Sequence, residues 1–209
     1  MIKNIIFDWG GVLSVSNHNE PIRRFEKLGL EGAEKYFDEG KNWNGIFGSI
    51  EDGSISQDDF LMQLSAMCRH SISFEDVAYA WWGFYNGLTE ELIPNLVEWR
   101  KKYRLVVLTN NNPFMMSVIR SESFTACGKP FCSYFDSVYA SCDLKMAKPS
   151  PYIYNRVMEL EHILPSESVM IDDRMSNLEG AAAAGLKIFH AESQPQWISK
   201  FNEYLKAEP

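Results

Sequence analysis

Asp8 is the first residue of the chain whose type and position could do chemistry. It follows the apolar run of residues 5–7 and precedes Gly10 and Gly11. In an open α/β sheet, ligands bind outside the carboxyl ends of the strands, and glycine lets the backbone approach an anion or a metal closely. Asp8 is therefore a candidate nucleophile or metal ligand. An ordinary strand-to-helix turn is the alternative, because Asp and Gly are common turn residues.

Thr109 and Asn110 end a second apolar run. A threonine hydroxyl followed by a backbone N–H at a strand end can bind a phosphoryl oxygen, since both groups donate hydrogen bonds. The competing interpretation is a turn rich in asparagine, because Asn111 and Asn112 follow directly.

Lys148 lies just before Pro149 and Pro151, one of which we expect to start a helix. An ammonium group held near Asp8 would stabilise negative charge on a phosphoryl group during its transfer. Lysines are usually solvated, so this role depends on the other groups being close. Lys145 is a weaker candidate, for which an exposed loop position is expected.

Asp172 and Asp173 follow another apolar run, and Asn177 comes shortly after them. Adjacent carboxylates repel each other unless a cation or hydrogen-bond donors compensate. Oxygen ligands without imidazoles favour Mg²⁺, which typically takes one or two carboxylates together with substrate phosphate and water. Pairing of Arg174 with one of the acids is the structural alternative.

Five short apolar segments must position these groups: residues 2–7, 104–109, 137–141, 168–171 and 187–190. Their nearly continuous apolar character predicts parallel strands that are covered on both faces. Helical patterns separate them at residues 93–103, 151–160 and 177–184, the last with Gly185 as C-cap. The alternation predicts an α/β fold with a doubly wound parallel sheet.

Residues 15–88 show no strand signal and several helical ones. Ser56 with Asp59, and Ser73 with Asp76, have the spacing of helix N-caps. We therefore expect a helical insertion at 15–88 in a core made of residues 1–14 and 89–209. An aromatic cluster in it is expected to serve packing, with substrate lining by one member as the alternative: Trp81, Trp82, Phe84 and Tyr85.

The composition of the chain argues against several classes of protein. The 209 residues carry a formal net charge of -8, which argues against a general nucleic-acid binder. No apolar stretch approaches the ~20 residues that cross a membrane, and no secretory signal follows Met1. The cysteines form no CxxC pair, so reduced thiols and a cytoplasmic location are expected, with a Cys127–Cys132 disulfide or metal pair as the alternative.

The four polar groups in this order resemble the four motifs of the haloacid dehalogenase superfamily of hydrolases. The opening Asp8-Trp9-Gly10-Gly11-Val12 and the Asp172-Asp173 pair are similar to its phosphatase branch that includes glucose-1-phosphate phosphatases. The similarity covers nearly the whole chain. It implies a Rossmann-like core in which the insertion forms a helical cap over the active site.

The resemblance also implies a role for each motif residue. Asp8 would be the nucleophile that forms an aspartyl-phosphate. The phosphoryl group would be bound by Thr109, the Asn110 amide and Lys148. Mg²⁺ would be bound by Asp8, the Gly10 carbonyl and Asp173, with Asp172 as a further ligand or a supporting group. Asn177 would orient groups of the same loop.

Gly10 departs from the family pattern. Most phosphatases of the superfamily have a second Asp there, which protonates the leaving oxygen and later activates water. Loss of such an acid and base typically costs ~10²- to 10⁴-fold in rate, and least for groups that depart without a proton. Nearby residues that could replace it are Ser14, Ser16, Asn17, His18 and Glu20.

The function expected from these features is that of a Mg²⁺-dependent phosphatase for a small phosphorylated metabolite such as a sugar phosphate. One alternative is a degenerate member that binds phosphorylated ligands or a protein partner without turnover, which Gly10 supports. Another is a dehalogenase, in which Asp8 attacks carbon and no metal is needed. The oligomeric state is not determined by the sequence.

Overall fold

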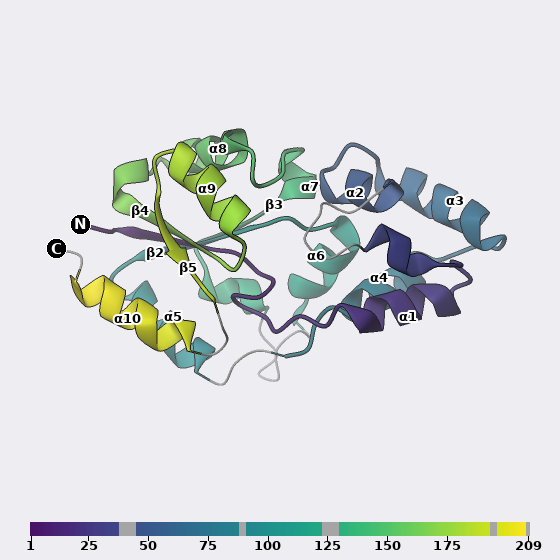
Figure 1. The fold of residues 1–209 in the computed structure, drawn as a ribbon, viewed down its shortest axis with the longest axis horizontal. Coiled ribbons are helices and arrows are strands. Elements are labelled where there is room, and N and C mark those ends of the chain that lie inside the picture. Colours follow the sequence, from purple (N-terminus) through teal and green to yellow (C-terminus); the bar gives the residue numbers. More distant parts are fainter. Residues whose placement is uncertain (38–44, 88–90, 123–129, 193–195, 208–209) are drawn as a thin grey trace.

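The computed structural model describes residues 1–37, 45–87, 91–122, 130–192 and 196–207 (Figure 1). A sheet of five parallel strands forms its core, in the order β3-β2-β1-β4-β5. The strands are Asn4–Phe7, Arg104–Thr109, Ser137–Ala140, Ser168–Asp172 and Lys187–His190, numbered β1 to β5 along the chain. Each predicted strand is present, with ends that shift by at most two residues, and the predicted α/β fold is confirmed.

The register of the sheet brings the polar groups together. Phe7 of β1 pairs with Val107 of β2 on one side and Ile171 of β4 on the other. Asp8 therefore leaves the sheet between the ends of these two strands, and its N–H still donates to the Ile171 carbonyl at 2.9 Å. This central position explains why residues far apart in sequence meet at one edge.

Helices cover both faces of the sheet (Figure 1). On one face α8 (Pro151–Glu161) and α9 (Met175–Ala183) pack over Ile6, Val106 and Met170. On the other, α5 (Leu92–Arg100) and α10 (Trp197–Ala207) pack over the alternate strand residues, with the Trp99 ring 5.8 Å from that of Phe7. Alternation of side chains along each strand therefore gives two apolar layers, as expected for a buried parallel sheet.

The helices predicted at 93–103, 151–160 and 177–184 correspond to α5, α8 and α9. Gly185 follows α9 with φ +88°, a conformation that suits a glycine after a helix end. The sequence analysis did not predict α10, although Trp197, Ile198 and Phe201 give it a buried face.

The described part of the predicted insertion is helical. It contains α1 (Asn19–Lys27), the 3₁₀ helix Ala33–Tyr36, α2 (Ile46–Glu51), α3 (Gln57–Cys68) and α4 (Phe74–Trp82). Ser73 and Asp76 form a reciprocal capping box at α4. At α3 the Ser56 hydroxyl accepts from the Asp59 N–H, without the returning bond from the Ser56 N–H. Both predicted N-caps are therefore present, and the reciprocal capping box forms at α4.

Aromatic rings fill the space between the insertion helices. The Phe25 ring lies 5.1 Å from that of Phe47 and 5.4 Å from that of Trp81. Phe47 is also 5.3 Å from Phe60 of α3. These contacts join α1, α2, α3 and α4, and they agree with the packing role expected of the aromatic cluster.

A helix from outside the insertion, α6 (Pro113–Ile119), lies among the insertion helices (Figure 1). Its Phe114 ring lies 5.4 Å from Phe60 and 5.0 Å from Phe74. One apolar cluster therefore runs from the sheet into the insertion. We refer to α1–α4 as the cap; the boundary at 15–88 stays a prediction.

Two further expectations concern single features. Cys127 lies outside the described residues, so its pairing with Cys132 is not addressed by the structure. Among the helices that are described, none has the length and apolar character needed to cross a membrane.

Candidate active site

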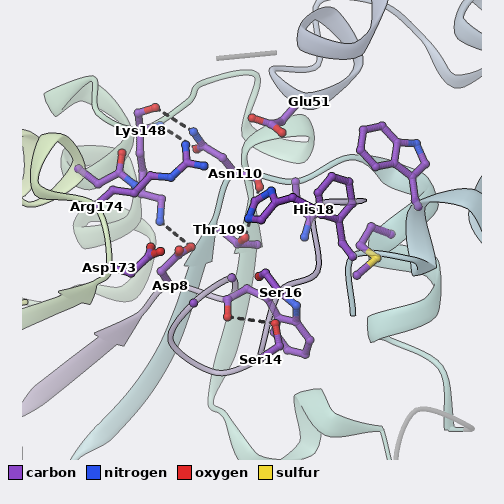
Figure 2. Close-up of a pocket in the computed structure, with 18 residues that line it drawn as sticks. Asp8, Ser14, Ser16, His18, Glu51, Thr109, Asn110, Lys148, Asp173 and Arg174 are labelled. Carbon is purple, nitrogen blue, oxygen red and sulfur yellow. Dashed lines mark hydrogen bonds and ion pairs between the residues drawn. The ribbon is translucent and has the colours of Figure 1, made fainter. Parts of the chain in front are cut away.

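A pocket of ≈ 160 Å³ opens between the carboxyl ends of the strands and the cap (Figure 2). Its lining includes residues from all four predicted motifs: Asp8, Gly10, Thr109, Asn110, Lys148, Asp173 and Asn177. Trp81 and Phe84 line it from the cap side. Two members of the aromatic cluster, Trp81 and Phe84, therefore line the pocket as well as pack. The rings of the other two, Trp82 and Tyr85, stack on each other with centroids 4.5 Å apart.

Lys148 occupies the centre of the charged groups. Its side chain is 1% exposed, and its ammonium donates to Asp8 Oδ1 and to Asp172 Oδ2, both at 2.7 Å. Burial alone would lower the pKa of Lys148, but the charges of Asp172 and Asp8 raise it above its ordinary value. The lysine is therefore a fixed positive charge beside the candidate nucleophile.

Asp172 is fully buried, and four hydrogen-bond contacts hold its carboxylate. Oδ1 accepts from the Arg174 N–H at 2.9 Å and from Asn177 Nδ2 at 3.0 Å. Oδ2 accepts from Lys148 and from the same Asn177 nitrogen at 3.1 Å. Because a carboxylate offers about four acceptor positions, Asp172 is saturated by protein groups. Its contacts favour positioning of Lys148 over metal binding, and Asn177 lies where the sequence predicted an orienting residue.

Asn110 joins the end of β2 to the loop that carries Lys148. Its side chain accepts from the Lys148 N–H and donates to the Lys148 carbonyl, each at 2.8 Å. Thr109, which is buried, lines the pocket beside it. The sequence predicted only a backbone role for Asn110; the structure adds a side chain that fixes the Lys148 loop.

Three carboxylates lie close together, and two of them, Asp8 and Asp173, line the pocket. Asp8, Asp172 and Asp173 each offer an oxygen, and these atoms lie within 4.8 Å of one another. Burial raises the pKa of Asp8 to about 7; Lys148 opposes that rise, while Asp172 and Asp173 add to it. A cation among these groups would favour the ionised form of Asp8, so the donor set fits a hard divalent ion such as Mg²⁺.

Gly11 is required where the loop passes Asp173. Its φ is +74°, and a Cβ there would lie 2.3 Å from Asp173 Oδ2. The second glycine of the opening motif therefore lets the backbone approach the exposed carboxylate of the pair. Gly10 is different, because a Cβ there would meet only Ser16 Oγ, at 3.5 Å. Position 10 therefore has space for a side chain, although the residue there is glycine.

The five residues considered as substitutes for the missing acid fall into two groups. The Asn17 side chain, just before α1, accepts from the N–H groups of Asn19 and Glu20, and Glu20 is held by Arg23 and Arg24 at 2.6 and 2.8 Å. These two do not line the pocket, whereas Ser14, Ser16 and His18 do. Lys145, the weaker lysine candidate, is exposed as expected.

Two pocket residues were missed as candidates. Glu51, at the end of α2, enters the pocket from the cap, and Arg174 directs its guanidinium towards the pocket from the start of α9 (Figure 2). Arg174 adjoins the Asp172-Asp173 pair, so its position was a signal. Glu51 lies in an ordinary helix-to-turn segment, Glu51-Asp52-Gly53, which gives no local indication of a site.

Comparison with known proteins agrees with this arrangement. Residues 2–185 match the model of a family described as haloacid dehalogenase-like hydrolase. A D-ribitol-5-phosphate phosphatase from Bacteroides thetaiotaomicron is 36% identical over 207 residues, which cover 99% of this chain and 100% of that protein.

Solved structures show the same fold. A predicted haloacid dehalogenase-like hydrolase from Porphyromonas gingivalis superposes with a TM-score of 0.91 at 31% identity, with 100% of both chains covered. A family enzyme from Bacteroides thetaiotaomicron, in complex with magnesium and inorganic phosphate, superposes with a TM-score of 0.81 at 29% identity, covering 91% of this chain and 94% of that one.

The resemblance inferred from the four motifs is thus confirmed at the level of the superfamily and its phosphatases. The narrower similarity to glucose-1-phosphate phosphatases is not shown by these relatives. The chain belongs to the haloacid dehalogenase-like hydrolases.

Proposed function

We propose that this protein is a Mg²⁺-dependent phosphatase that hydrolyses a small phosphorylated polyol or sugar through an aspartyl-phosphate on Asp8. The observation that carries the proposal is the buried Lys148 ammonium, bound to Asp8 and Asp172 in a pocket that Thr109 also lines. A carboxylate nucleophile, a fixed cation and hydrogen-bond donors at strand ends are the groups that phosphoryl transfer requires.

Each residue has a defined part in the reaction. An Asp8 oxygen attacks phosphorus as the bond from phosphorus to the leaving oxygen breaks, and Lys148 stabilises the negative charge that develops on the phosphoryl oxygens. Thr109 and the Asn110 N–H orient the same oxygens. Water then attacks the phosphorus, which breaks the bond to Asp8 and releases inorganic phosphate.

The metal ligands that we propose are Asp8, the Gly10 carbonyl and Asp173. Bound Mg²⁺ supplies positive charge that neutralises the phosphoryl oxygens. Asp172 stands apart from this set because its oxygens are engaged by Lys148, Asn177 and the Arg174 N–H. Its proposed role is to hold Lys148 in place.

The substrate class follows from the pocket and from the relative. The pocket is small, and beside the phosphoryl site it offers Glu51, His18 and Arg174 next to the rings of Trp81 and Phe84. Polar groups beside aromatic faces suit a short carbon chain that bears hydroxyls. The relative that matches this chain over its whole length is named for D-ribitol-5-phosphate, which is such a compound.

Phosphate release from a panel of phosphate esters tests the proposal. With Mg²⁺, we expect hydrolysis of D-ribitol-5-phosphate or a related sugar phosphate, loss of activity with a chelator, and no activity in Asp8→Asn that retains the fold. A well-folded protein that is inert towards the panel, yet gains thermal stability from fluoride complexes that mimic phosphate, would support the non-catalytic alternative instead. Metal-independent release of halide from a haloacid would favour the dehalogenase.

A further inference from the structure

Glu51 is an acidic group that enters the pocket from the cap (Figure 2). It is the last residue of α2, and its side chain is partly buried. Within the described residues, its carboxylate makes no hydrogen bond and no ion pair shorter than 4.0 Å. A carboxyl group that faces a reaction pocket without a protein partner is available to a substrate.

Contacts with the core fix the position of Glu51. Its backbone carbonyl accepts a hydrogen bond of 2.5 Å from the hydroxyl of Ser141, a buried residue at the start of α7 (Ser141–Leu144). Two residues later, Gly53 packs so closely that a Cβ there would lie 2.5 Å from the Cys142 carbonyl oxygen. The end of α2 is thus attached to the core beside β3, and Glu51 is placed by this junction.

The in-line geometry of phosphoryl transfer determines on which side of the pocket a proton donor for the leaving oxygen must lie. The attacking and leaving oxygens lie roughly in line through phosphorus, so the leaving oxygen departs on the side away from Asp8. Asp8 belongs to the floor formed by the strand ends, whereas Glu51 belongs to the cap wall. Glu51 therefore lies on the side of the pocket where an alcohol product would form.

The charges that act on Glu51 suit a proton donor. Burial raises the pKa of its carboxyl to about 7, with Arg174 and Lys148 opposing the rise and Asp8 and Asp52 adding to it. A carboxyl of this kind holds its proton in a large fraction of molecules near neutral pH and can take it back, as a general acid and base must.

We propose that Glu51 protonates the leaving oxygen, the role that Gly10 cannot perform; this inference rests on the phosphatase activity proposed above. As the phosphorus–oxygen bond breaks, its electron pair goes to the leaving oxygen, which takes the proton of the Glu51 carboxyl. In the second step Glu51 removes a proton from the water that attacks the aspartyl-phosphate, and so recovers its acid form.

His18 is the competing candidate, because it also lines the pocket. Its ring packs edge-on against Phe84, with centroids 5.6 Å apart and planes at 84°, which gives it a packing role. Ser16 lies nearest to the empty side-chain position at Gly10, but a hydroxyl is too weak an acid for this task.

Leaving-group dependence tests the proposal. Glu51→Gln should lower kcat about 10²- to 10³-fold on the alkyl phosphate that the wild type hydrolyses best, with D-ribitol-5-phosphate as the first choice. The loss on p-nitrophenyl phosphate should be far smaller, because its leaving group departs without a proton. Glu75→Gln, at an exposed position of α4 in the cap, is the matched control and should keep the wild-type ratio of the two rates.

A second variant separates proton donation from other roles. Gly10→Asp has room for its Cβ, since the nearest atom is Ser16 Oγ at 3.5 Å, and should restore much of the alkyl phosphatase activity lost in Glu51→Gln. The inference would be overturned if Glu51→Gln lost the same fraction of kcat on both substrates or changed only KM. It would also be overturned if the leaving-group-dependent loss appeared in His18→Gln and not in Glu51→Gln. A wild type inert towards both substrates would overturn the proposed function, and this inference with it.

Discussion

Lys148 shows how the surroundings of one residue define a site. Its ammonium lies between Asp8 and Asp172, and its backbone is held on both sides by the Asn110 side chain. Neither carboxylate would tolerate burial without it, because a buried charge needs a partner. The same cation that stabilises these two carboxylates is the one that a phosphoryl group would meet.

Replacement of Lys148 by methionine should therefore affect both stability and activity. In the presence of a chelator we expect Lys148→Met to lower the free energy of unfolding by about 3–5 kcal/mol, because two carboxylates lose their buried partner. Urea denaturation measures this change, and phosphate release, assayed separately with Mg²⁺, should be abolished. Lys145→Met, three positions earlier and exposed, is the control and should change neither quantity. A fully stable Lys148→Met protein would contradict the account.

Asp8, Thr109 and the Asp172-Asp173 pair were recognisable in the sequence because each comes at the end of an apolar strand and carries a group suited to phosphate or metal, and Lys148 because it precedes a helix start marked by proline. The sequence could not reveal that Asp172 is saturated, since that depends on Lys148 approaching from 24 residues away and on the turn that brings Asn177 back to the carboxylate. Glu51 was missed for a similar reason. Its position in the pocket depends on the contact between α2 and Ser141, 90 residues away in the chain.

At the scale of elements, helix α9 positions the Lys148 loop. Gly180 of α9 lies against the backbone of Pro149, and a Cβ at position 180 would lie 2.0 Å from the Pro149 carbonyl oxygen. Since the atom in conflict belongs to the backbone, a rotamer change cannot relieve it. The close approach of helix and loop is thus a condition for placing the adjacent lysine.

Gly180→Ala should consequently displace this loop. We expect a loss of about 1–3 kcal/mol in the free energy of unfolding from overpacking, together with a lower kcat as Lys148 moves. Thermal denaturation and steady-state kinetics measure the two effects. Glu179→Ala, at an exposed position on the same helix, is the comparison and should leave kcat unchanged. An unchanged kcat in Gly180→Ala would show that the loop does not depend on this contact.

The strands were predictable because buried parallel strands are continuous apolar runs bounded by polar residues. Helices α6 and α10 were not predicted, although Asn112 and Pro113 are a capping pair for α6. The association of α6 with the cap was beyond the sequence, because it rests on rings of α3, α6 and the start of α4 meeting in space.

At the scale of the whole molecule, Glu161 joins one edge of the sheet to helix α8. Its carboxylate accepts from Tyr139 of β3 at 2.5 Å and from Arg104 of β2. Burial by itself raises the pKa of Glu161, but hydrogen bonds from Ser137, Tyr139 and Arg104 outweigh it and hold the pKa below the ordinary 4.5. The ionised form is thus favoured by folding.

The sign of the pH effect follows from that shift. Because the pKa is lower in the folded state, Glu161 contributes stability above its unfolded pKa and loses it as pH falls through the folded value. Glu161→Gln should cost about 1–2 kcal/mol at neutral pH, and less below pH 4.5, when unfolding is measured across this range. Glu159→Gln, with a side chain 69% exposed, should follow the wild type throughout. A cost of Glu161→Gln that does not depend on pH would contradict this assignment.

The central claim is that Asp8 accepts the phosphoryl group, and trapping of the phosphorylated enzyme tests it most directly. The protein is mixed with Mg²⁺ and its best substrate, quenched with acid within one turnover, and digested for mass spectrometry. We predict one added phosphoryl group on the peptide that contains Asp8, absent from Asp8→Asn and from samples with chelator. Phosphate release by the wild type without this modification, or undiminished release by Asp8→Asn, would contradict the account.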